Sequence, residues 1–240
     1  MKFVLVHGAA HTGAHFDKVA EILRTEGHQV WCPTTKGNRA GDDPTKVTLD
    51  DAIGSVVDLF EEEEIDDAVL LGHSWGGMVI TGVADRLAPG RIRRLVYYSA
   101  FVPNNGESLM DMVPPHYAAM FQEMGDASGT VGFPFPIFRE AFMNDASLDD
   151  CQHHFDTLVP QPFRTMADKI TLSTDPAAMQ IGKSFLLMNE DISQPASYPW
   201  HPRLSEKLGL YRLVAMPGSH STFATNPEGL AQKIVEAGRD

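Results

Sequence analysis

The sequence has few cysteines and lacks long apolar runs. Its two cysteines, Cys32 and Cys151, form no disulfide framework and no Cys-x-x-Cys motif in a chain of 240 residues. No stretch approaches the roughly 20 consecutive apolar residues that a membrane-spanning helix needs. Residues 1–8 are too short and too soon interrupted for a signal peptide, and they read as a first strand. We therefore expect a cytoplasmic protein.

Positive charge is also scarce. The chain has 19 lysine and arginine residues against 32 aspartate and glutamate residues, which gives a formal net charge of −13. The acidic residues are spread along the chain and no long basic run occurs, which argues against nucleic acid and anionic membranes as partners. A small-molecule substrate remains the expected partner, and the sequence leaves open whether the chain is a monomer or a homodimer.

Short apolar runs alternate with amphipathic segments along most of the chain. Helical spacing of apolar residues follows several of these runs, for example over residues 16–23 and 49–60. Strands separated by helices indicate a parallel sheet that is covered on both faces, which is an α/β fold. We predict about six strands, at residues 3–6, 30–32, 68–71, 94–98, 184–188 and 211–215.

One long interval, residues 102–183, breaks this alternation. It is rich in methionine and phenylalanine and is punctuated by prolines. An excursion of this length between two strands is usually functional. We predict a helical cap subdomain at 102–183, inserted into a core formed by 1–101 and 184–240. Flexible and aromatic apolar side chains make adaptable pocket walls, and the candidates for lining a substrate pocket are Phe101, Met110, Phe121, Phe135, Phe138 and Phe142.

The most informative motif is Gly72-His73-Ser74-Trp75-Gly76-Gly77, which spells G-x-S-x-G directly after an apolar run. The residues after it follow a helical pattern. A strand, a sharp turn and a helix around this motif form a nucleophile elbow, which raises the serine hydroxyl above the sheet. Glycines on both sides of the serine avoid collisions in so tight a turn. We therefore predict Ser74 as a nucleophile.

A serine nucleophile needs a base within hydrogen-bonding reach and an acid that orients the base. In folds with a nucleophile elbow, the catalytic residues follow one another along the chain in the order serine, acid, histidine. His220 follows the last predicted strand and is the candidate base. Either Glu190 or Asp191, after the preceding strand, could be the acid. We prefer Asp191, because the residue pair before it more naturally completes the strand.

The oxyanion of an acyl-transfer intermediate needs backbone N–H donors. The residue after the nucleophile, Trp75, should supply one of them. The loop after the first strand should supply the other, and Ala9 is the candidate.

Histidines outside this set are not predicted to bind a metal. His7, His11 and His15 recur every four residues, but a metal-binding helix face there is opposed by nearby glycines. The neighbouring pair His153-His154 is expected to be solvated within the cap. We expect neither a metal ion nor a cofactor.

Taken together, these motifs resemble the plant methylesterase and hydroxynitrile lyase branch of the α/β-hydrolases and its bacterial esterase relatives. The resemblance runs nearly end to end and is weakest within the cap. It implies an α/β-hydrolase fold, a Ser74–Asp191–His220 triad and an oxyanion hole, and it favours Asp191 over Glu190. The matching segments are Phe3–Ala9, Leu71–Met78, Ala100–Pro103, Glu190-Asp191 with Pro195, and Gly218–His220.

Two positions depart from the lyase pattern. Lyases of this group have threonine at the position of Gly8 and lysine at the position of Ser221, directly after the histidine. Without that lysine, cyanide release is poorly supported. The sequence therefore predicts a carboxylesterase-type serine hydrolase acting on a small apolar or aromatic ester. The alternatives are C–C bond hydrolysis, hydroxynitrile cleavage or cofactor-free dioxygenation at the same site, and a ligand receptor that reuses the fold.

Overall fold

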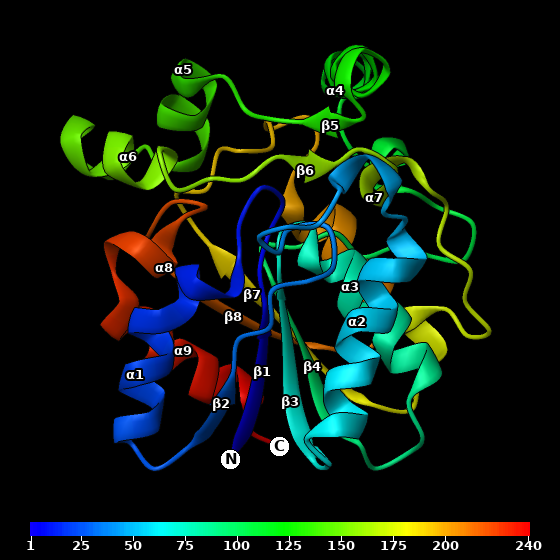
Figure 1. Ribbon diagram of the computed structural model, residues 1–240. Coiled ribbons are helices and arrows are strands. Elements are labelled where there is room, and N and C mark those ends of the chain that lie inside the picture. The colour runs from blue at the N-terminus through cyan, green and yellow to red at the C-terminus, as the bar shows by residue number, and fades with distance from the viewer.

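A computed structural model describes residues 1–240 and contains one central sheet of six parallel strands (Figure 1). The strand order is β2-β1-β3-β4-β7-β8. Each strand predicted from the apolar runs lies on one of these six, which confirms the predicted α/β architecture. The strands are β1 (Lys2–Val6), β2 (Gln29–Trp31), β3 (Ala68–His73), β4 (Ile92–Tyr98), β7 (Gly182–Met188) and β8 (Arg212–Met216).

Both faces of the sheet are buried, which explains why its strands are apolar without strict alternation. In β1, Phe3 and Leu5 contribute to the core on one face, whereas Val4 and Val6 contribute to the core on the other. Helices α1 (Asp17–Thr25) and α9 (Pro227–Gly238) cover the first face, and α2 (Leu49–Glu62) and α3 (Gly76–Arg86) cover the second (Figure 1).

The last helix, α9, begins at residues that favour a helix start. The Asn226 side chain accepts a hydrogen bond from the Gly229 amide at 3.0 Å, and Pro227 occupies the first turn, where its missing N–H costs nothing. The short helix α8 (Thr222–Thr225) directly precedes it. None of the helices combines the length and the apolar character that crossing a lipid bilayer requires.

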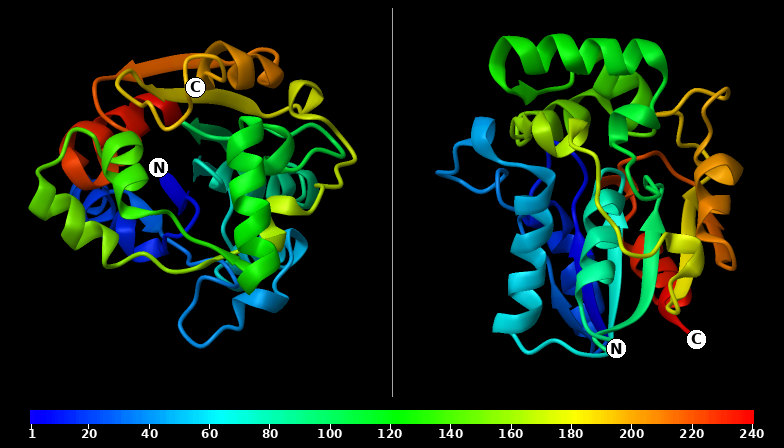
Figure 2. Two further views of the ribbon diagram at one scale, coloured as in Figure 1. Left: turned by 90° about the horizontal axis from the view of Figure 1, so that it is seen from above. Right: turned by 90° about the vertical axis from the view of Figure 1, so that its right-hand side faces the viewer.

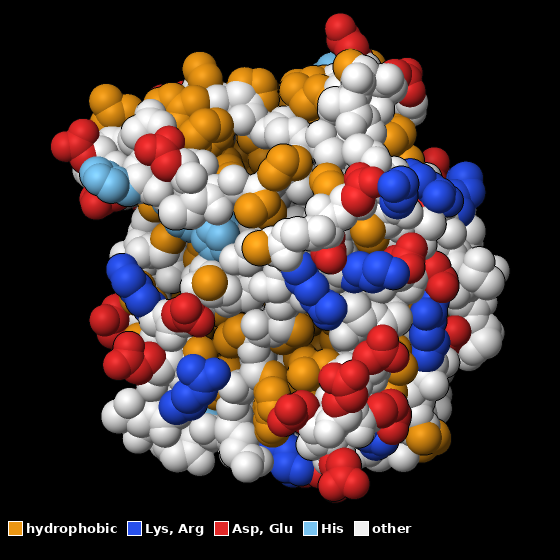
Figure 3. Space-filling view, in the orientation of Figure 1, with side chains coloured by type: hydrophobic (Ala, Val, Ile, Leu, Met, Phe, Trp, Pro, Cys, Tyr) orange, Lys and Arg blue, Asp and Glu red, His pale blue; other side chains and the backbone are white.

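The elements at residues 115–167, between β4 and β7, lie beyond the carboxyl ends of the sheet strands, at the top of Figure 1 and in the side view of Figure 2, and together they are called the cap below. They include a short antiparallel pair of strands that the sequence analysis did not predict, because strands of two residues give no alternation to read. Figure 3 shows hydrophobic side chains grouped over this upper part and charged side chains over the lower body. The elements are α4 (Pro115–Ser128), β5 (Thr130–Val131), α5 (Phe135–Ile137), α6 (Leu148–Phe155), β6 (Gln161–Pro162) and α7 (Arg164–Ala167).

Candidate active site

Ser74 lies in the sharp turn between β3 and α3 with a φ of +53°, a conformation that non-glycine residues rarely adopt. The turn is held by hydrogen bonds from the Ser74 amide to the Tyr98 carbonyl and from the Phe101 amide to the Ser74 carbonyl, both 3.1 Å long. A Cβ at Gly72 would lie 2.5 Å from the Gly76 carbonyl oxygen. The motif therefore forms the strand–turn–helix arrangement that the sequence predicts, and its glycines are sterically required.

His220 lies in the loop after β8, and its Nδ1 is 2.7 Å from Asp191 Oδ2. The Asp191 side chain is fully buried, and its Oδ1 accepts hydrogen bonds from the Ser193 hydroxyl at 2.6 Å and the Ser193 amide at 3.0 Å. Glu190, the other candidate acid, is exposed and makes no hydrogen bond to His220. Of the two acids that the sequence left open, the structure brings only Asp191 to the histidine.

The charge state of Asp191 follows from this environment. Burial alone would raise the pKa of the Asp191 carboxyl group. The charge of His220 and the hydrogen bonds from His220 and Ser193 outweigh burial and hold that pKa below its ordinary value. At neutral pH the carboxylate is therefore ionised and faces the histidine Nδ1 as a hydrogen-bond acceptor.

The backbone of His220 is fixed from below by the sheet. Its carbonyl accepts hydrogen bonds from His73 Nε2 at 3.0 Å and from the Tyr98 hydroxyl at 3.1 Å. The Trp200 ring stacks on the His220 ring with centroids 5.5 Å apart, and Phe142 contacts it edge-on at 5.3 Å. His73, within the G-x-S-x-G motif, thus helps to position the loop that carries His220.

The cap also holds this loop. Asp145 Oδ2 accepts hydrogen bonds from the Ser219 amide at 3.1 Å and from the Thr225 hydroxyl at 2.9 Å. The Ser221 amide donates to the Phe142 carbonyl at 2.9 Å. These contacts could not be predicted from the sequence, because an exposed aspartate in an irregular segment has no distinguishing spacing.

The two predicted oxyanion donors lie beside Ser74. Ala9 and Trp75 both line the same cavity as the serine. Neither backbone amide donates a hydrogen bond to another protein group, so both can bind a ligand oxygen. The Trp75 indole is fully buried and donates to the Thr165 carbonyl in the cap at 2.9 Å. The cap residue Gln161 accepts a hydrogen bond from the Ala10 amide at 2.8 Å, which fixes the loop that carries Ala9.

The cavity at Ser74 is lined by mainly apolar side chains from the core, the cap and the loop after β7. Three of the six predicted pocket residues, Phe101, Phe121 and Phe142, line it. The other lining residues are Ala9, Ser74, Trp75, Leu109, Val113, Tyr117, Phe133, Met166, Ser193, Gln194 and Trp200.

The remaining three predicted pocket residues lie elsewhere. Met110 packs against the main core, whereas Phe138 belongs to a separate small core within the cap. Phe135 packs against that small core, with its ring centroid 5.1 Å from that of Phe155. Aromatic content alone does not separate the residues that hold a cap together from those that face its cavity.

Of the two adjacent histidines in α6, one differs from expectation. His153 is exposed, as predicted. His154 is half-buried instead of solvated, because its ring packs against Phe138 and Phe223. The ring centroids are 5.8 Å and 5.5 Å from that of His154, respectively. Its Nε2 lies 3.1 Å from His11 Nε2.

Buried histidines make the stability of this protein sensitive to acid. Burial lowers the pKa of His7 from 6.5 to about 4, and its Nε2 accepts a hydrogen bond from the Thr35 amide at 3.1 Å. Between these pH values the unfolded chain binds a proton that the folded chain does not, so the free energy of unfolding falls as the pH falls. For His7 alone we expect a loss of about 2 kcal/mol between pH 7 and pH 5.

Urea unfolding of the wild type and of His7→Gln at both pH values tests this. The variant retains an acceptor for Thr35 and should lose less stability on acidification. His153→Gln, at an exposed histidine, is the matched control and should follow the wild type. An equal loss in His7→Gln and the wild type would contradict the assignment.

Comparison with known proteins identifies the family of this chain. A profile of the alpha/beta hydrolase family matches residues 3–233. The carbendazim hydrolyzing esterase of Nocardioides sp. (strain SG-4G) is 37% identical over 245 residues, which cover 98% of this chain and 99% of that protein. Methylesterase 18 of Arabidopsis thaliana is 26% identical over 261 residues, which cover 98% of this chain and 96% of that protein.

The same likeness extends to a solved structure. It is an extracellular alpha/beta-hydrolase from a Paenibacillus species, described as sharing structural and functional homology with tobacco salicylic acid binding protein 2. It superposes with a TM-score of 0.96 at 37% identity and covers 100% of both chains. The resemblance to plant methylesterases and bacterial esterases is thereby confirmed, and the chain belongs to the alpha/beta hydrolase family.

Proposed function

We propose that this protein is a carboxylesterase-type serine hydrolase that cleaves carboxylic esters of small apolar or aromatic compounds. One observation carries the proposal: Ser74, held in a strained elbow, lines an apolar cavity whose residues Phe142 and Trp200 also contact His220 of the Asp191–His220 pair. The names of the related carbendazim hydrolyzing esterase and methylesterase support an ester as the substrate class.

In this mechanism His220 takes the proton of the Ser74 hydroxyl as the oxygen attacks the ester carbonyl. The oxyanion that forms is bound by the backbone amides of Ala9 and Trp75. Asp191 keeps the imidazole in the reactive tautomer and stabilises the imidazolium. His220 then protonates the leaving alcohol, and water hydrolyses the acyl-enzyme by the reverse proton path. These steps require no cofactor.

The arrangement of the chain suits a small ligand. We infer that residues 102–183 act as a cap over a core of 1–101 and 184–240, because cap and core residues together line the cavity. A lining of mainly apolar side chains favours substrates with an apolar or aromatic body. The cytoplasmic location expected from the sequence stays a prediction, since the related Paenibacillus hydrolase is described as extracellular.

Gln194 is a polar exception in the cavity wall and should select among substrates. Its side chain is buried and its Oε1 has no hydrogen-bond partner in the protein. An ester with a suitably placed O–H or N–H group can satisfy this acceptor. We expect Gln194→Leu to lower kcat/KM for such an ester by about 3- to 10-fold, the worth of one neutral hydrogen bond.

Methyl mandelate and methyl phenylacetate form a suitable substrate pair, because they differ in one hydroxyl group. The loss in Gln194→Leu should fall on methyl mandelate and leave methyl phenylacetate nearly unchanged. An equal loss for both esters would show that the substitution merely disturbs the cavity.

The proposed function is tested by assaying hydrolysis of p-nitrophenyl acetate and butyrate and by mass spectrometry after treatment with an organophosphonate. We expect saturable turnover and a single adduct on the peptide that contains Ser74. An adduct without turnover of any ester would indicate other chemistry or a receptor role. Absence of both would overturn the assignment of the nucleophile.

A further inference from the structure

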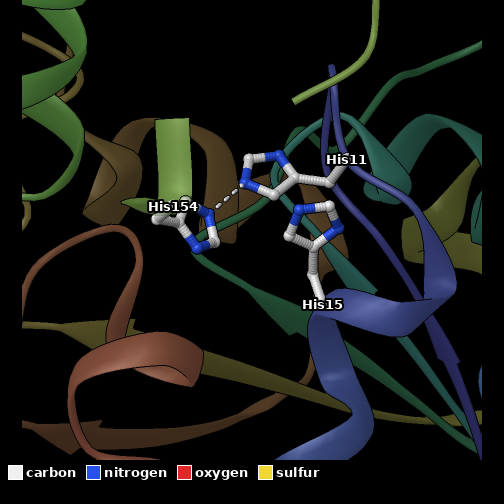
Figure 4. A group of neighbouring side chains, drawn as sticks. All are labelled: His11, His15 and His154. Carbon is white, nitrogen blue, oxygen red and sulfur yellow. Dashed lines mark hydrogen bonds between the residues drawn. The ribbon is translucent and has the colours of Figure 1, made fainter. Parts of the chain in front are cut away.

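Three histidines outside the proposed catalytic set meet where the cap joins the core. His11 and His15 lie in the segment between β1 and α1, and His154 lies in α6 (Figure 4). One ring nitrogen from each lies within 4.8 Å of the other two, and the Nε2 atoms of His11 and His154 are 3.1 Å apart. A tetrahedral zinc ion with Zn–N bonds of about 2.0–2.1 Å holds its ligand nitrogens about 3.3 Å apart. The His11–His154 spacing fits two ligands that share one ion, and His15 would have to move closer to these two to become the third.

Neighbouring groups orient the two core rings. His11 Nδ1 donates to the Ala9 carbonyl at 2.7 Å, which leaves the lone pair on Nε2 facing His154. A hydrogen bond of this kind fixes the ring orientation of a metal-binding histidine. His15 Nδ1 lies 3.2 Å from the Thr12 carbonyl oxygen and 2.9 Å from the Thr12 amide nitrogen, and its Nε2 lies 3.1 Å from the Thr157 hydroxyl. An ion at Nε2 requires the tautomer in which Nδ1 carries the proton and donates to the Thr12 carbonyl. An ion bound at His15 Nε2 would replace the Thr157 hydroxyl.

The cluster can be reached from solvent. His154 and Thr157 line a surface groove together with the cap residues Asp145 and Asp150. Figure 3 shows histidine atoms, in pale blue, at the surface just below the cap. His15 and His154 are half-buried, whereas His11 forms the buried end of the cluster. Three protein nitrogens and solvent on the outer side leave a fourth position for water.

We propose that His11, His15 and His154 form a binding site for a divalent transition-metal ion such as Zn²⁺, Co²⁺ or Ni²⁺. Three imidazoles select such ions over Mg²⁺ and Ca²⁺, which prefer oxygen ligands. The site joins α6 of the cap to the loop after β1, so a bound ion clamps the cap onto the core. The site is next to Ala9, the proposed oxyanion donor, because His11 Nδ1 donates a hydrogen bond to the Ala9 carbonyl.

The test uses the full chain without a polyhistidine tag, freed of metal with EDTA and dialysed. Zn²⁺ binding is measured by isothermal titration calorimetry and by thermal unfolding, and Co²⁺ binding is followed by visible absorption. The wild type should bind one equivalent of Zn²⁺, unfold at a higher temperature when it is bound, and give a cobalt spectrum typical of nitrogen ligands in a tetrahedral site.

Two variants make the test specific to this cluster. His154→Ala should weaken Zn²⁺ binding by at least about tenfold and remove the thermal shift. His153→Ala, at the adjacent exposed histidine, should retain both. The cobalt spectrum of the wild type provides a readout that needs no variant to fold. No cobalt band in the wild type, or Zn²⁺ binding of equal strength in His154→Ala, would overturn the proposal.

Discussion

Replacing Ser74 by alanine is expected to lower kcat for p-nitrophenyl butyrate by about 10⁴- to 10⁶-fold, to the limit of detection. Ser74 is the hydroxyl of the elbow, and its backbone is fixed by hydrogen bonds to Tyr98 and Phe101. Alanine removes the attacking oxygen without changing that frame, so the loss should be in chemistry rather than in folding. Initial rates with the wild type and Ser74→Ala, purified from separate expression strains, measure the effect.

Ser128→Ala is the matched control, because Ser128 is an exposed serine at the end of α4. It should keep full activity. Substantial turnover in Ser74→Ala would mean that His220 and Asp191 act directly as a base on substrate or water, as in the cofactor-free reactions that the sequence leaves open. The acyl-enzyme mechanism would then be wrong.

Replacing Asp191 by asparagine is expected to lower kcat by about 10⁴-fold. Asp191 Oδ2 is 2.7 Å from His220 Nδ1, in a position with no exposure to water. An asparagine there can turn its NH₂ group toward Nδ1 and stabilise the tautomer that cannot accept the serine proton at Nε2. It also removes the negative charge that stabilises the imidazolium. The same ester assay measures the loss, with circular dichroism as the check on folding.

Glu190→Gln is the matched control one residue earlier in the chain. Glu190 is exposed and makes no hydrogen bond to His220, so we expect a change of less than about twofold, as for surface substitutions generally. A large loss in Glu190→Gln and a small one in Asp191→Asn would transfer the role to Glu190.

Features carried by local sequence could be predicted well. The six strands and the elbow follow from short apolar runs and from glycines at fixed offsets around Ser74, because the buried sheet and the tight turn impose those residues directly. His220 and the acidic pair at 190–191 follow from their place after two strands. Which of the two acids serves depends on which side chain points toward the histidine, and the structure brings Asp191 into contact with His220.

Features that depend on how the cap folds could not be predicted in the same way. Phe138 and Phe142 are four residues apart, yet the first packs inside the cap and only the second lines the cavity. Gln161 and Asp145 act through contacts with residues more than 70 positions away. His11 and His15 are brought near His154 by a turn and a short 3-10 helix, which a search for continuous helical spacing overlooks.

The contacts of Asp145 and Phe142 with the loop that carries His220 bear on how new substrate specificities could arise in this family. A cap taken from a relative to change substrate choice would have to carry an acceptor for the Ser219 amide and a carbonyl for the Ser221 amide. A chimera without these two acceptors could bind the new substrate, but the loop that carries His220 would be less well held. Exchanges that replace residues before 142 and spare residues 142–145 are expected to change the pocket and keep a working reaction centre, because cavity residues such as Tyr117, Phe121 and Phe133 precede the spared segment.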